Sequence, residues 1–366
     1  MIDTKEFLNF LKRKKIRFFT GVPDSVLKNF LNEVSKNKSI LNITAVNEGS
    51  AIALAIGNYL SSKKLPLVYL QNSGLSNAIN PLISIASKSV YSIPMLLIIG
   101  WRGAPGLVDE PQHMAKGRIT KDLLYRLNIR NITLKKKNDF SKISKLISYS
   151  KKKKLPVAIL IKNGTFTKSK KVKIKDSKKT ILRSLFIIEL LKKINSNDRI
   201  ISTTGYTSRE LNQIRKLYSL NKGKDFYMVG GMGHSAGVAL GYSFSSKNKI
   251  FCLDGDGSML MHLGSIFTAG KYKKKNYRYI LLNNNSHESV GGQSTNSEYI
   301  DFKKLSESLN FKKYYLINNS QNIKKIINNF IKNDGPNFLE VKIKNKSIEN
   351  LGRPKNLKKI LSNFQG

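Results

Sequence analysis

Short apolar runs recur along the first half of the chain and alternate with stretches of helical periodicity. Because each run is continuously apolar, it predicts a strand that is covered on both faces, as in a parallel sheet. A helix is predicted over Phe7, Leu8 and Leu11, with Asp3 and Glu6 forming its capping box. The predicted strands lie at residues 16–19, 41–46, 67–70, 95–101 and 157–161.

The same alternation starts again in the second half. A predicted helix over residues 181–194 comes first, and residues 166–180 before it are polar and lysine-rich, as is typical of a linker. We therefore predict two α/β domains, at 1–165 and 181–366, each with a doubly wound parallel sheet whose carboxyl edge gathers ligands. The strands of the second domain are predicted near residues 199–202, 226–229, 250–253, 277–282, 314–317 and 338–343.

Composition narrows the class of protein. The chain has 366 residues, of which 40% are hydrophobic, and this content is typical of a globular protein. Cys252 is the one cysteine, so no internal disulfide can form, and the first residues do not resemble a secretion signal. No apolar stretch approaches the roughly eighteen residues of a membrane span. We expect a reduced, cytoplasmic protein with no membrane partner.

The formal net charge of +42 raises the possibility of nucleic-acid binding. The lysines, however, cluster at predicted helix ends and loops, for example at 12–15, 151–154 and 273–275, and are not interleaved with aromatic residues. We interpret them as a solvated surface and expect no specific nucleic-acid partner. Such a surface would still attract anionic substrates.

Candidate metal ligands follow two predicted strands of the second half. The strand at 250–253 leads into Gly255-Asp256-Gly257-Ser258, and the strand ending at Leu282 leads into residues 283–286, Asn-Asn-Asn-Ser. A glycine-rich turn before a helix suits a phosphate, and a carboxylate with amide and main-chain oxygens suits Mg²⁺. The two turns predict a site for both, provided that the strands are neighbours.

Another motif points to a different class of enzyme. Gly233-His234-Ser235-Ala236-Gly237 matches G-x-S-x-G, the nucleophile elbow of α/β hydrolases, and it lies between a predicted strand and a predicted helix. A serine hydrolase with Ser235 as its nucleophile is therefore an alternative. It would leave the two turns described above without a function.

The pair of turns resembles the diphosphate-binding motif of thiamine diphosphate enzymes. The resemblance implies a pyrimidine-binding domain at 1–165, a diphosphate-binding domain at 181–366 and no middle domain. It implies that Asp256, Asn284 and the carbonyl of Ser286 hold Mg²⁺, with Asn283 as the competing ligand. Glu48, in "AVNEGSAIALAIG", matches the glutamate that activates the cofactor's aminopyrimidine ring. The remaining cofactor contacts implied are Asn72, Ser73, Gly231, Met232, Gly255, Gly257 and Ser258.

Several further stretches resemble a short, two-domain branch of this family, the decarboxylases of phosphonopyruvate and sulfopyruvate. They are "GVPDS" at 21–25, "NEGSA" at 47–51, "QNSGLSNAINPL" at 71–82, "GWRGAPG" at 100–106, "DEPQH" at 109–113 and "HESVGGQST" at 287–295. The resemblance implies decarboxylation of a small anionic 2-oxo acid, with phosphonopyruvate as the first candidate and sulfopyruvate as the second. It also implies a homo-oligomer whose site lies at the subunit interface, because in the family the two domains come from different subunits.

Residues for the substrate are expected at the same strand ends. A tetrahedral oxyanion needs cationic and hydrogen-bonding groups, and the long loop from Arg102 to Arg118 contains several of them. We predict that Arg102, Gln112, His113 and Lys116 bind substrate. Residues expected to position the carbonyl or to move protons are Asp24, Ser25, His113 and His287, with Glu288 beside them. His262 is interpreted as a packing residue within the helix that follows the Gly-Asp-Gly turn.

Overall fold

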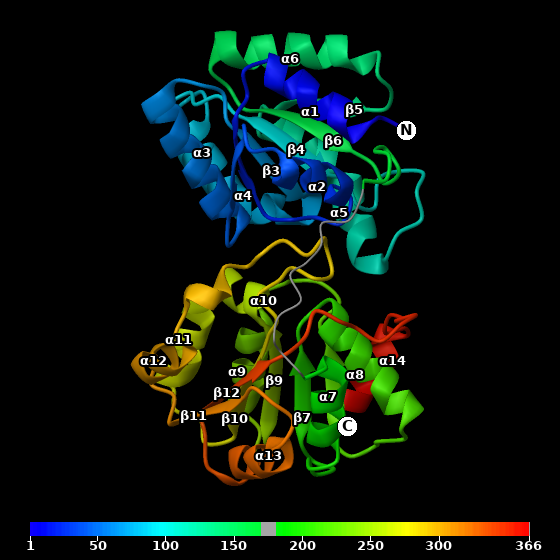
Figure 1. Ribbon diagram of the computed structural model, residues 1–366, viewed down its shortest axis with the longest axis vertical. Coiled ribbons are helices and arrows are strands. Elements are labelled where there is room, and N and C mark those ends of the chain that lie inside the picture. Colours follow the sequence, from blue (N-terminus) through cyan, green and yellow to red (C-terminus); the bar gives the residue numbers. More distant parts are fainter. Residues whose placement is uncertain (170–180, 366) are drawn as a thin grey trace. The chain divides into compact units, whose positions relative to one another are not determined.

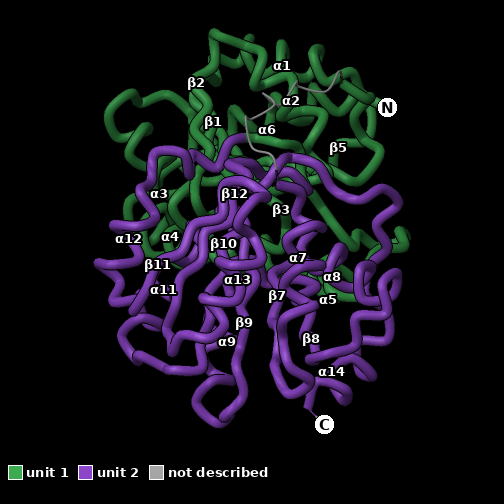
Figure 2. Tube along the Cα trace, turned by 60° about the horizontal axis from the view of Figure 1, so that its bottom comes forward, with its two compact units in different colours: residues 1–173, 290–293 green, residues 174–289, 294–366 purple. Residues whose placement is uncertain are grey.

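The computed structural model describes residues 1–169 and 181–365, which fold as two compact units (Figure 2). Residues 1–173 and 290–293 belong to the first unit, and residues 174–289 and 294–366 to the second. Most of the predicted linker, at 170–180, lies outside the described residues. The predicted linker starts at Phe166, which is buried against Phe7 and Phe30 in the core of the first unit.

The first unit is a six-stranded parallel sheet in the order β2-β1-β3-β4-β6-β5, with helices on both faces (Figure 1). Its strands are β1 (Phe18–Gly21), β2 (Leu41–Thr44), β3 (Leu67–Gln71), β4 (Leu96–Gly100), β5 (Arg130–Leu134) and β6 (Val157–Ile161). Its helical segments are α1 (Thr4–Arg13), α2 (Lys28–Lys36), α3 (Glu48–Ser62), η1 (Asn72–Gly74), α4 (Leu75–Pro81), η2 (Leu82–Ala86), α5 (Pro111–Arg126) and α6 (Asp139–Lys153).

The continuous apolar runs are explained by burial on both faces of this sheet. Successive side chains of a strand point to opposite faces. Leu67 and Tyr69 of β3 pack with α1, α2 and α6, whereas Val68 and Leu70 pack with α3, α4 and α5. Each face therefore has its own apolar core, and every position of a central strand must be apolar.

The second unit repeats this plan in the order β11-β12-β10-β9-β7-β8, again with all strands parallel (Figure 1). Its strands are β7 (Arg199–Ser202), β8 (Lys224–Tyr227), β9 (Ile250–Gly255), β10 (Tyr277–Asn283), β11 (Lys313–Ile317) and β12 (Asn337–Lys342). Its helical segments are α7 (Arg183–Leu191), α8 (Tyr206–Leu217), α9 (Ser235–Phe244), α10 (Asp256–Met261), α11 (Leu263–Lys271), η3 (Ser297–Tyr299), α12 (Phe302–Ser308), α13 (Ile323–Lys332) and α14 (Leu357–Gln365). The predicted class, two doubly wound parallel sheets, is confirmed.

Three details of the element prediction were wrong. The strand predicted at 16–19 lies two residues too early, since β1 starts at Phe18. β5 was not predicted, because it is an edge strand with an exposed Arg130 and three half-buried residues, so it lacks an apolar run. The predicted strand at 226–229 lies two residues too late, since β8 starts at Lys224 and pairs with β7 from there. Asp3 does cap α1 as predicted, accepting a hydrogen bond from the backbone N–H of Glu6 at 2.7 Å.

Each sheet has a point where the chain reverses the direction in which it adds strands. In the first unit this point lies between β1 and β3, and in the second between β7 and β9. The loops that leave two such neighbouring strands diverge to opposite faces of the sheet, and this opens a crevice at the carboxyl edge. Asp24 and Gln71 lie at this edge in the first unit, and Thr203 and Asp256 lie at it in the second, so these residues are candidates for the functional site.

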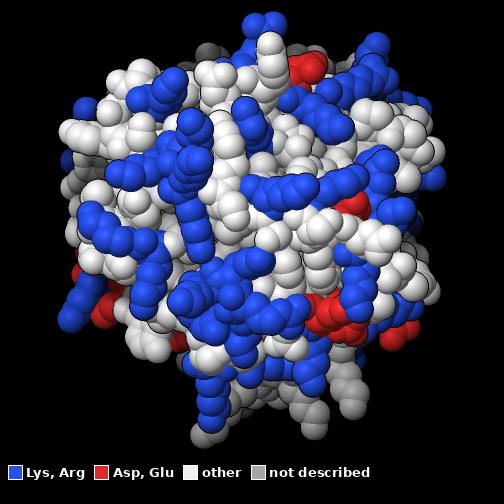
Figure 3. Space-filling view, turned by 90° about the horizontal axis from the view of Figure 1, so that it is seen from above, with Lys and Arg blue, Asp and Glu red and all other residues white. Residues whose placement is uncertain are grey.

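The excess positive charge is spread widely over the face shown in Figure 3, where Lys and Arg side chains greatly outnumber Asp and Glu. The ends of α1 and α6 come together, with Lys151 Nζ 3.2 Å from the carbonyl oxygen of Lys14. Burial, followed by the nearby charges of Lys14 and Lys15, lowers the pKa of Lys151. Over the part of the chain that the structure describes, no helix has the length and apolarity needed to cross a membrane.

Candidate active site

A chain of three side chains lies at the reversal point of the first unit. Ser73 Oγ donates to Gln71 Oε1 at 2.7 Å, and Gln71 Nε2 donates to Asp24 Oδ1 at 2.6 Å. Asp24 is fully buried, and its Oδ2 accepts the backbone N–H groups of Val26 and Leu27. Burial raises the pKa of Asp24, although these hydrogen bonds oppose the shift. Asp24 is thus suited to holding a proton, and Ser73 connects it toward the surface.

Glu48 is the first residue of α3, directly after a cap in which the Asn47 side chain accepts from Ser50 N at 2.8 Å. The Glu48 side chain is buried, with 6% exposure, and its Oε2 accepts from Asn77 Nδ2 at 2.8 Å. A Cβ at Gly74 would lie only 2.0 Å from Glu48 Oε1. Glycine at 74 is therefore what allows this carboxylate to lie against η1.

The Asn72 side chain has a structural role that could not be predicted from the sequence. Its Nδ2 donates to the carbonyl of Arg102 at 2.9 Å and to Thr120 Oγ1 at 3.0 Å, and its Oδ1 accepts from Arg102 N at 3.1 Å. The amide therefore joins the end of β3 to the loop after β4 and to α5. It fixes the point at which the long loop from Arg102 leaves the sheet.

Arg102 is held by the carboxylate of Asp109, which was not predicted as a site residue. Its Nε donates to Asp109 Oδ2 at 2.7 Å, its Nη2 donates to Asp109 Oδ1, and its Nη1 donates to Ser25 Oγ at 3.2 Å. Burial would raise the pKa of Asp109, but the guanidinium and the backbone N–H groups of Glu110 and Gly103 hold it well below its usual range. The structure thus brings Arg102 and Ser25 together and fixes the orientation of the guanidinium.

The other predicted substrate ligands lie on the first turns of α5. Gln112, His113 and Lys116 are each partly exposed there, and Pro111 starts the helix. α5 packs closely on the loop, because Gly103 lies against the backbone of His113. Arg102 and α5 therefore form one continuous segment anchored by Asn72 and Asp109.

Three strand ends converge on Ser258 in the second unit. Thr203, directly after β7, places its Oγ1 2.9 Å from Ser258 Oγ, which also accepts from Gly233 N at 3.0 Å. Ser258 lies in α10, which starts at Asp256. Gly231 and Met232 belong to the same turn as Gly233, between β8 and α9, where Gly231 is exposed and Met232 half-buried. Thr203 was missed by sequence reasoning, since a single threonine after a strand carries no recognisable pattern.

Asp256 is buried among hydroxyl groups. Its Oδ2 accepts from Ser297 Oγ at 2.8 Å and from Thr295 Oγ1. Ser297 Oγ also lies 3.2 Å from Asn283 Oδ1 and 2.8 Å from Asn285 Oδ1. The two turns predicted to meet therefore do meet, because β9 and β10 are neighbouring strands.

The adjacent asparagines have different hydrogen-bond partners. Asn283 Nδ2 donates to Glu340 Oε1 at 2.8 Å, on the neighbouring strand β12, so this side chain is tied into the sheet. Asn284 Oδ1 accepts from Ser286 N at 3.1 Å, and its Nδ2 donates to Glu288 Oε2 at 3.2 Å. Among the described residues, Ser286 Oγ is a buried oxygen without a hydrogen-bond partner. A carboxylate, amide oxygens and main-chain carbonyls are the ligands that a hard divalent cation prefers.

The two residues after this turn differ in what they can do. His287 is half-buried, and burial lowers its pKa to about 4, so the imidazole is neutral near pH 7. A Cβ at Gly257 would lie 2.7 Å from His287 Cε1, so glycine is required for this packing. Glu288 Oε2 accepts from Arg183 Nη2 at 2.6 Å. Glu288 is therefore engaged in a salt bridge, and its use in proton transfer stays a prediction.

The nucleophile-elbow hypothesis is not supported by the geometry. Ser235 is buried, with 1% exposure, and it starts α9 without the strained turn that exposes a hydrolase nucleophile. The neighbouring His234 instead stacks on His262, with ring centroids 4.5 Å apart. His262 does pack as expected, but it lies at the break between α10 and α11 and not within one helix.

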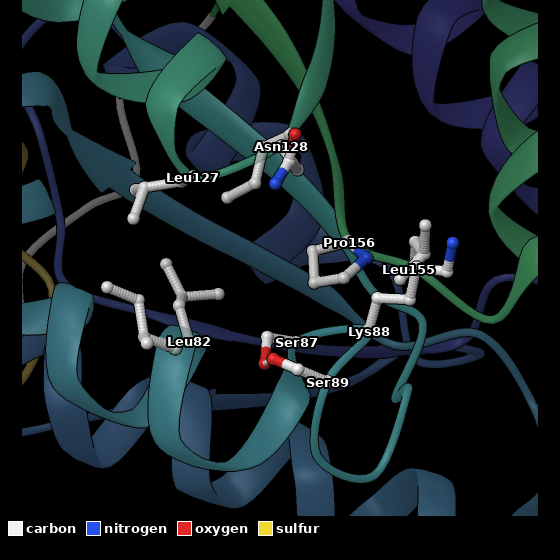
Figure 4. A pocket seen from close by; sticks show the side chains of 10 residues that line it. Leu82, Ser87, Lys88, Ser89, Leu127, Asn128, Leu155 and Pro156 are labelled. Atoms are coloured by element: carbon white, nitrogen blue, oxygen red, sulfur yellow. Dashed lines mark hydrogen bonds between the residues drawn. The ribbon is translucent and has the colours of Figure 1, made fainter.

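A cavity of about 370 Å³ lies at the opposite edge of the first sheet (Figure 4). Its lining includes residues that precede strands, such as Lys88 before β4, Asn128 before β5 and Pro156 before β6, along with Leu82. Ligands of doubly wound sheets bind outside the carboxyl ends of the strands. This cavity is therefore separate from the strand ends that carry Asp24, Gln71 and Arg102.

Comparison with known proteins gives two family matches. Residues 4–123 match the thiamine pyrophosphate enzyme N-terminal TPP binding domain, and residues 203–341 match the corresponding C-terminal TPP binding domain. The first match contains Asp24, Glu48 and Arg102, and the second contains Ser258 and Asn284. The two matches therefore fall on the two units that the structure describes separately.

Individual relatives cover nearly the whole chain. It is 30% identical to the phosphonopyruvate decarboxylase of Streptomyces hygroscopicus over 376 aligned positions, which cover 97% of this chain and 91% of that protein. It is also 30% identical to the phosphonopyruvate decarboxylase of Streptomyces viridochromogenes, over 97% of this chain and 92% of that one. The sulfopyruvate decarboxylase of Methanosarcina acetivorans is 23% identical, over 87% of this chain and 85% of that protein.

Proposed function

The chain belongs to the thiamine pyrophosphate enzymes and is a thiamine diphosphate-dependent 2-oxo acid decarboxylase, and from this we propose that it converts 3-phosphonopyruvate to phosphonoacetaldehyde and CO₂. The phosphonopyruvate decarboxylases match at 30% identity over 97% of the chain, whereas the sulfopyruvate decarboxylase that matches over a comparable length is 23% identical, and this supports phosphonate. Separate subunits of sulfopyruvate decarboxylases are 31–36% identical to this chain over 30–42% of its length. Sulfopyruvate is the second candidate, because a sulfonate presents a similar tetrahedral group of oxygens.

The observation that carries the proposal is the buried carboxylate of Glu48. Asn77 holds one of its oxygens, and Gly74 leaves room for the other, so the group is pre-oriented at the start of α3. We propose that Glu48 hydrogen-bonds the aminopyrimidine ring of the cofactor. When bound, thiamine diphosphate supplies the electron sink for the bond that breaks as CO₂ leaves.

The second unit offers ligands that fit the charged end of the cofactor. We propose Asp256, Asn284 and the carbonyl of Ser286 as the Mg²⁺ ligands, as the resemblance to the family implies, with Asn283 as the competing ligand. The hydroxyls around Asp256 can rotate when a cation arrives, because a hydroxyl has both a proton and lone pairs. The turn at Gly255, Gly257 and Ser258 would accommodate the diphosphate close to the backbone.

The first unit provides groups suited to the substrate. Arg102 presents a guanidinium whose geometry is fixed by Asp109, as recognition of a phosphonate or carboxylate requires. Gln112, His113 and Lys116 on α5 would add donors and positive charge. Asp24, with its raised pKa, can hold the proton needed after CO₂ leaves, and the hydrogen bonds from Ser73 to Gln71 and from Gln71 to Asp24 fix the orientation of this carboxyl group.

We propose a homo-oligomer in which the two halves of each site come from different subunits. Helices α3 and α9 are apolar around most of their surface, yet Leu54 and Leu60 of α3 are 38% and 55% exposed and Val238 of α9 is 38% exposed. A helix that is apolar all round is normally covered. A second copy of the chain would cover these faces.

The decisive experiment compares the two 2-oxo acids on the same purified protein. With thiamine diphosphate and Mg²⁺ present, CO₂ release from phosphonopyruvate should exceed release from sulfopyruvate in kcat/KM. CO₂ release should stop when Mg²⁺ is removed with a chelator or when thiamine diphosphate is removed by dialysis. A preference for sulfopyruvate would establish the second candidate, and undiminished activity without both cofactors would refute the mechanism.

A further inference from the structure

An ion cluster in the second unit connects the start of α7 to the turn after β10. Arg183, at the first position of α7, has a side chain that is only 5% exposed. Its Nη1 donates to Glu210 Oε1 on α8 at 3.1 Å, and its Nη2 donates to Glu288 Oε2 at 2.6 Å. Two carboxylates from distant parts of the chain thus share one buried guanidinium.

The cluster continues to a residue of the candidate metal site. Glu288 Oε2 accepts a second hydrogen bond, from Asn284 Nδ2 at 3.2 Å. An ionised carboxylate can only accept hydrogen bonds, so it selects the NH₂ end of the Asn284 amide and turns the oxygen end away. The salt bridge to Arg183, with Arg183 Nη2 2.6 Å from Glu288 Oε2, in turn fixes the position of Glu288.

Stability alone is a weak reason for such a cluster. The cost of removing charges from water offsets much of the attraction in a buried salt bridge, and an apolar replacement is often as stable. Burial raises the pKa of Glu210, which shows that the surroundings penalise its charge. A geometric requirement at Asn284 would account for keeping these charges buried.

We propose that Arg183 and Glu288 are positioning residues that orient the Asn284 amide so that its oxygen serves as a ligand for Mg²⁺. This inference rests on the proposed function, in which Asn284 binds the cation. Arg183 fixes Glu288, and Glu288 holds the Asn284 NH₂ group. The amide oxygen, which accepts from Ser286 N at 3.1 Å, retains a second lone pair for the metal. Neither positioning residue contacts the ion itself in this arrangement.

The test is Glu288→Gln, which keeps the size of the side chain but removes its charge. A glutamine can donate as well as accept, so it no longer selects one end of the Asn284 amide. Titration calorimetry with Mg²⁺, at saturating thiamine diphosphate, should show affinity weakened by about tenfold or more, the usual effect of losing an outer-shell partner. Arg183→Lys, which keeps the charge but loses the forked geometry, should give a smaller loss.

Asp225→Asn is the matched control. Asp225 forms a salt bridge of similar burial with Arg215 in the same unit, but its partners lie around β8 and not at the turn after β10. It should lower the free energy of unfolding without changing Mg²⁺ affinity. Unchanged affinity in Glu288→Gln, or an equal loss in Asp225→Asn, would overturn the positioning role. Failure of the unaltered protein to bind Mg²⁺ with thiamine diphosphate would instead refute the proposed function.

Discussion

The two units use the same parallel sheet to surround their key carboxylates with different neighbours. In the first unit, amide groups serve the carboxylates: Gln71 donates to Asp24, and Asn77 donates to Glu48. In the second unit, the hydroxyls of Thr295 and Ser297 serve Asp256. An amide NH₂ can only donate, whereas a hydroxyl can turn and also accept. In the proposed function, amides thus fix the carboxylates assigned to proton chemistry, while hydroxyls surround the carboxylate assigned to a cation.

The strongest test of this contrast is Glu48→Gln in the first unit. Loss of a positioned acid or base typically costs about 10² to 10⁴ in rate, so turnover should fall by that order. Thiamine diphosphate affinity, measured by calorimetry, should change little, since the side chain keeps its size. Turnover close to that of the parent protein would remove Glu48 from the proposed role.

Next in size is a paired substitution in the second unit. Asn284→Ala should weaken Mg²⁺ affinity by about tenfold or more, because it removes a proposed ligand. Asn283→Ala should mainly lower the free energy of unfolding, by about 1–3 kcal/mol, because Glu340 Oε1 loses its buried donor. Calorimetry and urea unfolding of both variants separate the two effects. The reverse pattern would make Asn283 the ligand.

A smaller effect is expected from Gln71→Leu. Its hydrogen bond lowers the pKa of Asp24 against the effect of burial, so removing it should raise that pKa further. Asp24 must hold its proton to act, so the alkaline limb of the kcat/KM profile should move to higher pH. Ser73→Ala, which keeps the Gln71–Asp24 bond, should move it less. A profile that does not move in Gln71→Leu would show that Asp24 does not govern the reaction.

The smallest effect concerns stability and His262. Burial, and then the charge of His234, lowers the pKa of His262 below its usual value of 6.5. The folded state therefore binds fewer protons than the unfolded state, and the contribution of this group to stability is present above that value and lost as the pH falls. His262→Phe keeps a ring against His234 but does not titrate. Between about pH 7 and about pH 5, the free energy of unfolding measured in urea should fall less in the variant than in the parent protein. An equal fall in the two proteins would contradict the assignment.

Much of the fold followed from local patterns. Runs such as 157–161 are apolar at every position because both faces of a central strand are covered, so they could be recognised without any knowledge of their neighbours. β5 could not, because an edge strand has one partly solvated side and no continuous run. Asp256 and Asn284 stood out because a glycine-rich turn and an asparagine run follow strands. The single residues Thr203, Asp109 and Ser297 carry no such pattern.

The sequence by itself determined the two parallel-sheet domains, the family and the identity of the principal carboxylates, because these depend on periodicity and on short motifs. Only the tertiary structure decided which side chains share those carboxylates. It tied Asn283 to Glu340, gave Arg102 to Asp109, buried Ser235 and linked Arg183 to Glu288. Hydrogen bonds and salt bridges form between residues that are far apart along the chain, so their partners are set by strand order and helix packing and not by neighbouring letters.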